Sequence, residues 1–462
     1  MRQVLRIWSE SDGNPEGGEM LVRPRQIKIG TDAFDGFDLL ERKESAHRLT
    51  ELVDRVEDPL VIALDGGWGT GKSWFLKLWP GEHRKKGGAA RLIYFDAFAH
   101  DFLDAPLASL TQRLETEVSG QRGTAAKAMK TVTNAAKRIA IPAVRIGTAI
   151  ATLAVSEAAA GAANAVMAEL EPLVGSLWQS EKSRIEAMGH FRKGLADLAC
   201  ETPLVFIVDE LDRCRPDYAL ATLEVIKHFF DVPKVHFVLG ANFTALRSSV
   251  SARYGSEINA GLYLQKFVNL TMTLPEPKDA PSPVKYLNLL IERLRAEGHP
   301  LATRLRLIDE LSQIAAMPKI AARLNLRAIE RVLDRIALFP GDLDKAPWPE
   351  QMLAVFAAIL EASDRSLFEA FLAGTADQET IGKLCTEQRP YDSAKRSQKS
   401  LTLQSICLEV LGGMASADDR QSLTHIYRME VDDNGFGSYL RGRLAAAFAA
   451  FSLPPKLAGV EG

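Results

Sequence analysis

A glycine-rich loop between an apolar run and a helix is the feature that most limits what this chain can fold into. The apolar run 60–64 is followed by residues 66–73, which read Gly-Gly-Trp-Gly-Thr-Gly-Lys-Ser. This is the spacing GxxxxGK[ST], in which glycines let successive backbone N–H groups turn toward phosphate oxygens at the start of a helix. The sequence therefore predicts a strand, a phosphate-binding loop and a helix, in that order.

Each position of this loop has an expected task when a nucleoside triphosphate binds. The residues expected to surround the phosphates are Gly66, Gly67, Trp68, Gly69, Thr70, Gly71, Lys72 and Ser73. We expect Lys72 to reach the β- and γ-phosphates. We expect Ser73 to place its hydroxyl on Mg²⁺, a hard ion that prefers oxygen ligands. The loop thus predicts ATP and Mg²⁺ as cofactors, and the motif by itself does not separate ATP from GTP.

A second apolar run ends in carboxylates. Residues 204–208 lead directly into Asp209 and Glu210. We expect Asp209 to hold the metal through water and Glu210 to polarise the attacking water, because a carboxylate at a strand end faces the γ-phosphate. The alternative is that these acids only cap the N-terminus of a helix. After the next run, 235–239, Asn242 either contacts the γ-phosphate or water as a sensor, or caps a loop.

Four compact apolar runs predict the fold class. They are 60–64, 92–95, 204–208 and 235–239. Their length and their branched or aromatic residues are typical of strands buried on both faces, and helical patterns between them indicate parallel pairing. Helices are predicted over 38–56, 218–230, 302–317, 324–338, 350–373, 401–412 and 421–451. The predicted fold class is α/β, a P-loop NTPase parallel sheet with a helical insertion, followed by an α-helical C-terminal region.

The insertion, at about 105–197, is alanine-rich and far longer than the usual crossover between such strands. Its apolar parts, 139–156 and 158–168, raise the question of membrane spans, but Arg145 and Glu157 interrupt them. Alanine is also only weakly favourable in lipid. We therefore predict a packed helical hairpin that contacts a protein, or weakly a membrane surface, without anchoring the chain.

Charge and cysteine content exclude other classes of protein. Lys and Arg total 56 against 59 for Asp and Glu, so no global positive field favours nucleic acid. The four cysteines form no CxxC pair, and the chain contains no HExxH motif and no Cys/His cluster, which argues against a disulfide framework or a zinc site. The polar N-terminal segment lacks an apolar signal core, so we expect a cytoplasmic protein, with peripheral membrane contact as the alternative.

Taken together, these motifs resemble the KAP family of P-loop NTPases, within the AAA+/STAND-like group of the ASCE division. Four stretches carry the resemblance: GGWGTGKS (66–73), YFDAFAHD (94–101), VDELDRCRP (208–216) and YLQKFVNLTMTLPEP (263–277). It covers about residues 36–340. The family commonly has an insertion between its Walker elements, often with membrane helices, and the alanine-rich, charge-broken insertion here departs from that pattern.

The residue patterns and the resemblance together predict a domain order. It is an N-terminal arm (1–35), an NTPase core (36–285), a helical lid (286–375) and a C-terminal helical domain (376–462), of which the resemblance implies the core and the lid. Arg327 on the lid would reach the nucleotide. A solvated helix face is the alternative, because Arg327, Arg331 and Arg335 share one stripe at four-residue spacing.

Two further arginines, Arg213 and Arg215, also have two interpretations. Either one acts on a neighbouring subunit as an arginine finger, or it pairs internally with Asp212. The sequence leaves both open.

The function predicted is an ATP-hydrolysing conformational switch, in which nucleotide orders the helical C-terminal region and hydrolysis releases it. Resemblance to bacterial relatives adds phage defence, or another conflict system, as the setting. The alternatives are a nucleotide-stabilised scaffold with little turnover, and a DNA-handling AAA+-type ATPase, for which Lys395, Arg396 and Lys399 form a modest basic patch. A protein partner or self-association is expected through the insertion or the C-terminal region.

Overall fold

The computed structural model describes residues 21–22, 26–36, 38–154, 163–385, 402–413, 417–427 and 435–449. The chain divides into two compact units. The sheet unit comprises Ile27–Asp38 and Arg42–Pro275, and the helical unit comprises Met1–Gln26, Leu39–Glu41 and Glu276–Gly462. The division of the chain into arm, core, lid and C-terminal domain stays a prediction.

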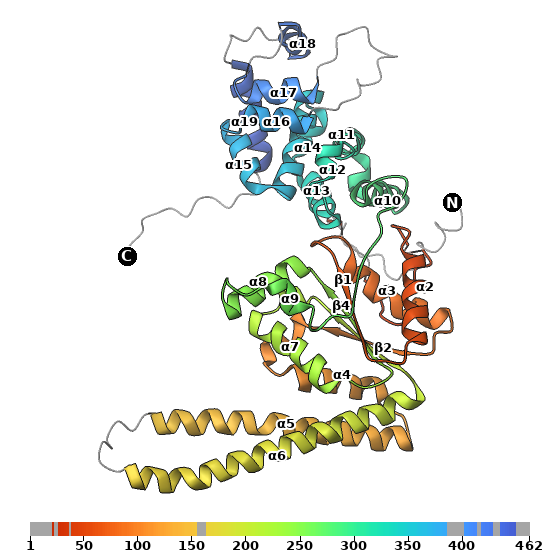
Figure 1. Ribbon diagram of the computed structural model, residues 1–462. Helices are drawn as coiled ribbons and strands as arrows, with labels where there is room; N and C mark the ends of the chain where they lie inside the picture. The colour runs from red at the N-terminus through yellow and green to blue at the C-terminus, as the bar shows by residue number, and fades with distance from the viewer. Residues whose placement is uncertain are drawn as a thin grey trace, which may run out of the picture. The chain divides into compact units, whose positions relative to one another are not determined.

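The sheet unit is built on five parallel strands in the order β2-β3-β4-β1-β5 (Figure 1). Their bounds are β1 Leu60–Asp65, β2 Arg91–Asp96, β3 Leu204–Asp209, β4 Val235–Ala241 and β5 Leu270–Thr273. The parallel sheet is confirmed, and the first four strands agree with the predicted runs within two residues at each end. The edge strand β5 was not predicted, because it is only four residues long and none of its residues is fully buried.

Alternate strand residues face opposite helical layers, as the period of two in a strand requires. Ile62 and Leu64 pack on the side that carries α2 (Lys43–Arg55) and α3 (Lys72–Lys85), whereas Ala63 faces the other side. That other layer contains α4 (Pro106–Val118), α7 (Pro216–Phe229), α8 (Phe243–Tyr254) and α9 (Ala260–Leu264). Both faces are therefore covered, which explains why the central strands read as continuous apolar runs.

The insertion between β2 and β3 contains α4 and two long helices, α5 (Thr124–Ala154) and α6 (Ala163–Glu201). The long helices lie side by side as a hairpin that projects from the sheet (Figure 1). At its base, Val132 and Phe191 are fully buried in the core on that side of the sheet. Among the residues that the structure describes, no helix is long and apolar enough to cross a membrane.

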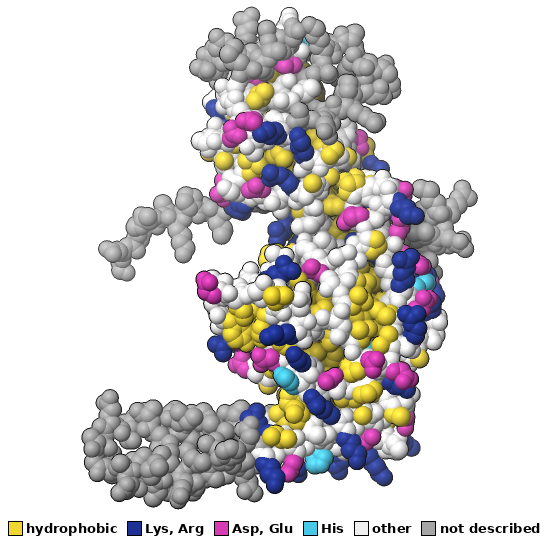
Figure 2. All heavy atoms as spheres, in the orientation of Figure 1, with side chains coloured by type: hydrophobic (Ala, Val, Ile, Leu, Met, Phe, Trp, Pro, Cys, Tyr) yellow, Lys and Arg dark blue, Asp and Glu magenta, His cyan; other side chains and the backbone are white. Residues whose placement is uncertain are grey.

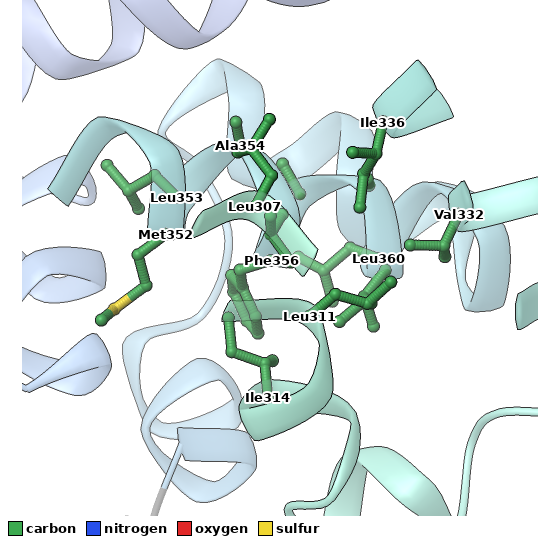
Figure 3. Close-up of a cluster of buried hydrophobic side chains, with 14 of the residues drawn as sticks. Leu307, Leu311, Ile314, Val332, Ile336, Met352, Leu353, Ala354, Phe356 and Leu360 are labelled. Atoms are coloured by element: carbon green, nitrogen blue, oxygen red, sulfur yellow. The ribbon is translucent and has the colours of Figure 1, made fainter. Parts of the chain in front are cut away.

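The helical unit packs around α14, which is buried along most of its length. Figure 3 shows Phe356 of α14 among aliphatic side chains such as Leu311 and Ile314. The helices of this unit are α10 Ser282–Ala296, α11 Leu305–Ala315, α12 Pro318–Ala321, α13 Leu326–Leu338, α14 Trp348–Ser363, α15 Arg365–Ala373, α16 Gln378–Cys385, α17 Leu403–Val410, α18 Ala417–Tyr427 and α19 Gly435–Ala449.

Several helix predictions in this unit were wrong in detail. The predicted helix 350–373 is two helices, because Asp364 leaves the helical conformation and its carboxylate accepts the Leu367 N–H at 3.0 Å as the cap of α15. The predicted helix 421–451 corresponds to the end of α18 and to α19. Helices α10 and α16 were not predicted at all. The basic patch with Lys395, Arg396 and Lys399 lies outside the described residues.

Candidate functional site

The predicted nucleotide-binding residues meet at the carboxyl edge of the sheet, because all five strands run parallel and end on that side. β1 leads through the loop 66–71 into α3, and β3 ends at Asp209. Strand β4 lies between β1 and β3, with Gly240 in register with Asp209 and Ala241 in register with Asp65. The sheet order thus brings the glycine-rich loop and the acidic strand end to the same edge.

The loop has the backbone conformation that its glycines allow. Gly69 and Gly71 have φ values of 75° and 86°, in the left-handed region that side chains disfavour. Thr70 Oγ1 donates to Gly67 O at 2.9 Å, which closes the turn from within. From outside, the buried Arg42 donates from NH1 to Thr70 O at 2.7 Å. Arg42 was not found from the sequence, because no motif marks an arginine so far upstream of the loop.

Lys72 is held inside this loop. Its Nζ donates to Gly66 O at 2.5 Å and to Gly67 O at 2.9 Å, and the residue is 8% exposed. Burial lowers the pKa of the ammonium, and the nearby carboxylates, Asp212 first and then Asp209, oppose that shift. The loop therefore holds the desolvated ammonium group of Lys72. When phosphates bind, its N–H groups could donate to phosphate oxygens in place of the loop carbonyls.

Asp209 is the most enclosed acid of the site, at 1% exposed. Tyr94 donates its hydroxyl to Oδ2 at 2.8 Å, and the Glu210 N–H donates to Oδ1 at 2.9 Å. Burial raises the pKa of Asp209, and Tyr94, the nearby Ser73 hydroxyl and the Glu210 N–H lower it. The structure thus brings the two predicted metal ligands, Ser73 and Asp209, close together.

Two neighbours of Asp209 went unrecognised in the sequence. Tyr94 lies in the YFDAFAHD stretch, but its role as a donor depends on the pairing of β2 with β3. Gly240 on β4 leaves the space that Asp209 occupies. A Cβ at Gly240 would lie 2.7 Å from Asp209 Oδ1 and 2.3 Å from Leu76 Cδ1. This close approach explains a glycine in the middle of a buried strand.

Glu210 directly follows the strand with left-handed backbone angles, φ 60° and ψ 27°. It is the N-cap residue of η2 (Leu211–Arg213), but its side chain makes no capping hydrogen bond. Instead, Glu210 Oε1 lies 3.0 Å from NH1 of Arg213. Burial raises the pKa of Glu210 and the Arg213 guanidinium lowers it. A carboxylate with a raised pKa in a partly closed site is suited to accept a proton from water. The role of Glu210 in catalysis stays a prediction.

The internal partner predicted for Arg213 and Arg215 was wrong. Arg213 pairs with Glu210, whereas the guanidinium of Arg215 contacts Asp104 and the carbonyl of Asp101. The Arg215 N–H also donates to Asp101 Oδ2 at 3.1 Å. Both arginines are thus paired within the chain.

Asp212, the partner that had been predicted, accepts a hydrogen bond from the indole of Trp68. A side chain of the glycine-rich loop therefore contacts the segment after β3.

Asn242 caps α8, which was one of its two interpretations. Its Oδ1 accepts the N–H groups of Thr244 at 3.1 Å and Ala245 at 3.3 Å. Asp65, at the end of β1, accepts the Phe243 N–H at 3.0 Å beside it. The Asn242 side chain still carries an amide NH₂ group, so its sensor role stays a prediction.

Arg327 lies in the other unit, on α13. Arg327 and Arg331 are exposed, while Arg335 bonds from Nε to Glu361 Oε2 of α14 at 2.7 Å. The stripe therefore divides into one arginine fixed within the helical unit and two at its surface. A contact from Arg327 to nucleotide stays a prediction.

The side chains at the carboxyl edge fit a magnesium nucleotide. Mg²⁺ in proteins is commonly held by one or two protein oxygens, with phosphate and water oxygens completing the set. Ser73 and Asp209 lie close together and would supply such oxygens, and Lys72 would supply positive charge for the phosphates.

Comparison with known proteins gives one family. A family model described as the KAP family P-loop domain matches residues 42–339. A search of curated proteins gives no match.

Among solved structures, the ORC2 protein of Aeropyrum pernix in its ADP form aligns over 96% of this chain and 97% of that chain, with 12% identity and a TM-score of 0.33. AMPPCP-bound DnaA from Aquifex aeolicus aligns over 91% and 98%, with 13% identity and a TM-score of 0.28.

Proposed function

The chain belongs to the KAP family of P-loop NTPases, and we propose that it hydrolyses ATP in a Mg²⁺-dependent reaction. One observation carries the proposal. A buried lysine of the phosphate loop and two consecutive carboxylates at the end of β3 meet at one edge of the sheet, with Ser73 close to Asp209. A scaffold that only binds nucleotide would need Lys72, Ser73 and Asp209, but it would not need the second carboxylate, Glu210, beside them.

Each residue has a separate task in the proposed reaction. Lys72 neutralises phosphate charge, and the loop amides orient the phosphates. Ser73 and Asp209 would hold Mg²⁺, which would supply positive charge against the phosphate oxygens. Glu210 orients the attacking water and takes its proton. Arg213 limits the rise of the Glu210 pKa, so that the carboxylate form stays available.

The test is to separate binding from turnover. In a titration with a fluorescent ATP analogue, Lys72→Ala should weaken binding strongly and should abolish phosphate release as well. Asp209→Asn should keep part of the binding but lose its dependence on Mg²⁺. Competition by GTP in the same titration determines the base preference. Parental binding by Lys72→Ala would contradict the site assignment.

We also propose that nucleotide orders the helical unit through Arg327. The support is that Arg327 is exposed on α13, and that the family match at 42–339 includes this helix. Protease protection of the C-terminal half should rise with ATP in the parent and not in Arg327→Ala. The matched control is Arg331→Ala, which removes the neighbouring exposed arginine of the same helix. If ATP protects the parent and Arg327→Ala equally, the proposed coupling through Arg327 is contradicted. The ATPase proposal is not affected by that result.

The proposed setting is a cytoplasmic defence or other conflict system, in which the ATPase acts on a protein partner or on a second copy. All four cysteines are free thiols, which supports a reducing compartment. The defence setting itself rests on motif resemblance to bacterial relatives. A nuclease, protease or deaminase encoded beside this chain would support it, and neighbours of ordinary metabolism would count against it.

A further inference from the structure

Helix α5 belongs to a stretch with an extreme local charge balance. No Asp or Glu occurs between Glu117 and Glu157. Six basic residues occur in the same stretch: Arg122, Lys127, Lys130, Lys137, Arg138 and Arg145. The near-neutral charge of the whole chain hides this local excess, which becomes visible only when the hairpin is considered by itself.

The basic residues of the described part of α5 lie on one side of the helix. The opposite side is buried and consists of Ala125, Ala128, Met129, Val132, Ala135, Ala136 and Ile139. Lys127, Lys130, Lys137 and Arg138 are all exposed. The spacings between these residues along the chain are three, seven and one, which at 3.6 residues per turn places all four on one face of the helix. Lys127 and Lys137 are about 15 Å apart along the helix axis. We call these four residues the basic stripe.

The charges of the basic stripe are not neutralised within the described part of the chain. None of the four residues forms an ion pair with a described acid, although many other surface bases do, such as Arg48 with Glu44. Figure 2 shows Lys and Arg side chains, with a few Asp, Glu and His side chains among them, along the lower edge of the hairpin base. Between them on the same face, Thr131 and Asn134 are also exposed. The surface therefore offers positive charge together with small hydrogen-bonding groups.

We propose that the basic stripe binds the phosphate backbone of duplex DNA, without reading its sequence. A straight row of cations on a stiff helix matches a partner whose negative charges are regularly spaced and fixed. Phosphate contacts of this kind come from Lys, Arg, Thr and Asn side chains, the types present on this face.

Other partners fit the face less well. Insertion into a membrane surface needs exposed apolar side chains beside the charges, and the apolar side of the described α5 is buried. Binding of single strands relies on aromatic stacking, and α5 contains no Phe, Tyr or Trp. The core of a protein interface is depleted in lysine and enriched in aromatic residues. Duplex DNA remains as the partner whose chemistry matches.

The proposal is tested on the full-length protein by fluorescence anisotropy with a short duplex of scrambled sequence. The test variant is Lys127→Ala/Lys130→Ala/Lys137→Ala, since alanine keeps the helix. Four phosphate contacts predict that log affinity falls with log salt at a slope of about −3.6, or about a hundredfold loss from about 50 to 200 mM salt. The triple variant should bind at least tenfold more weakly, with a slope near −1.

The control removes three exposed bases elsewhere, Arg48→Ala/Arg365→Ala/Lys383→Ala, each from an i,i+4 pair on another helix. It should bind DNA as the parent does. Circular dichroism and ATP hydrolysis should be parental in both variants, which keeps this test separate from the ATPase proposal. Equal binding and slope in the parent and the α5 variant would overturn the proposal. So would binding only to single strands, to duplex RNA or to anionic phosphatidylserine vesicles.

Discussion

The indole Nε1 of Trp68 donates a hydrogen bond to Asp212 Oδ2 at 2.6 Å. The two residues are 144 positions apart, yet they join the phosphate loop to the segment that follows the acidic strand end. A contact of this kind holds the loop in one shape before the phosphates arrive, which lowers the cost of ordering it on binding.

We predict that Trp68→Phe and Asp212→Ala, which each remove one partner of this bond, weaken ATP binding about fivefold. A hydrogen bond to a charged group contributes about 1.5 to 3 kcal/mol, and because Trp68 is 54% exposed we expect about 1 kcal/mol here. The double variant should bind no more weakly than either single variant, because both remove the same bond. Titration with a fluorescent ATP analogue gives all four affinities. Independent, additive losses would show that the contact does not shape the loop.

The contact of Glu210 with Arg213 predicts a change in the pH dependence of hydrolysis. The base must be ionised, so activity falls as the pH drops through the pKa of Glu210. Burial raises that pKa and Arg213 lowers it, so Arg213→Ala should move the acid side of the rate profile to higher pH. Phosphate release measured across pH provides the readout. Arg215→Ala is the control, and a profile that does not move in Arg213→Ala would contradict the role assigned to Glu210.

Gly240 predicts a steric effect at the metal site. An alanine there would bring Cβ to within 2.7 Å of Asp209 Oδ1 and 2.3 Å of Leu76 Cδ1. Overpacking a buried site costs about 1 to 3 kcal/mol, so Gly240→Ala should lower the unfolding temperature and weaken Mg²⁺-dependent hydrolysis together. The comparison variant is Gly255→Ala. Gly255 has a positive φ, but a Cβ there would meet no neighbour, so this variant measures the cost of backbone strain without overpacking. A Gly240→Ala variant with parental stability and activity would contradict the packing described.

The sequence was sufficient where function depends on a contiguous segment. Residues 66–73 form the glycine-rich turn with their own backbone, and Asp209 and Glu210 directly follow the run 204–208, so local pattern locates both. Tyr94, Arg42 and Gly240 act across the fold on partners far away in the chain, and no local pattern marks such contacts.

Helices α10 and α16 and strand β5 also went unpredicted. Helix α16 and strand β5 are short, with eight and four residues, so packing with neighbours decides their structure more than intrinsic preference does. Helix α10 has 15 residues and carries apolar residues at helical spacing, such as Leu287, Leu290 and Leu294, so its pattern was present in the sequence and was missed. The number of strands and the full helix order therefore needed the structure.

Glu310 predicts a pH-dependent stability. It is 4% exposed on α11, and burial raises its pKa from 4.5 to about 7, with Arg306 lowering it and Asp309 raising it. Because the folded state binds this proton more tightly than the unfolded state, stability increases as the pH falls from above 7 toward 4.5. Glu310→Gln should therefore raise the free energy of unfolding by about 3 kcal/mol above pH 7, and by little near pH 4.5.

Urea unfolding at both pH values measures the Glu310 effect. Glu369→Gln, at an exposed carboxylate of α15, is the control and should change stability little at either pH. An equal gain for Glu310→Gln at both pH values would mean that proton binding is not its cause.

The central claim, that this chain hydrolyses ATP with Glu210 as the base, is tested most directly by phosphate release from the parent and from Glu210→Gln at saturating ATP and Mg²⁺. The glutamine keeps the size of the side chain and removes its ability to take a proton. We predict that the parent turns over, and that Glu210→Gln binds ATP as tightly but releases phosphate about 10² to 10⁴ times more slowly. Phosphate release by Glu210→Gln at the parental rate would contradict it.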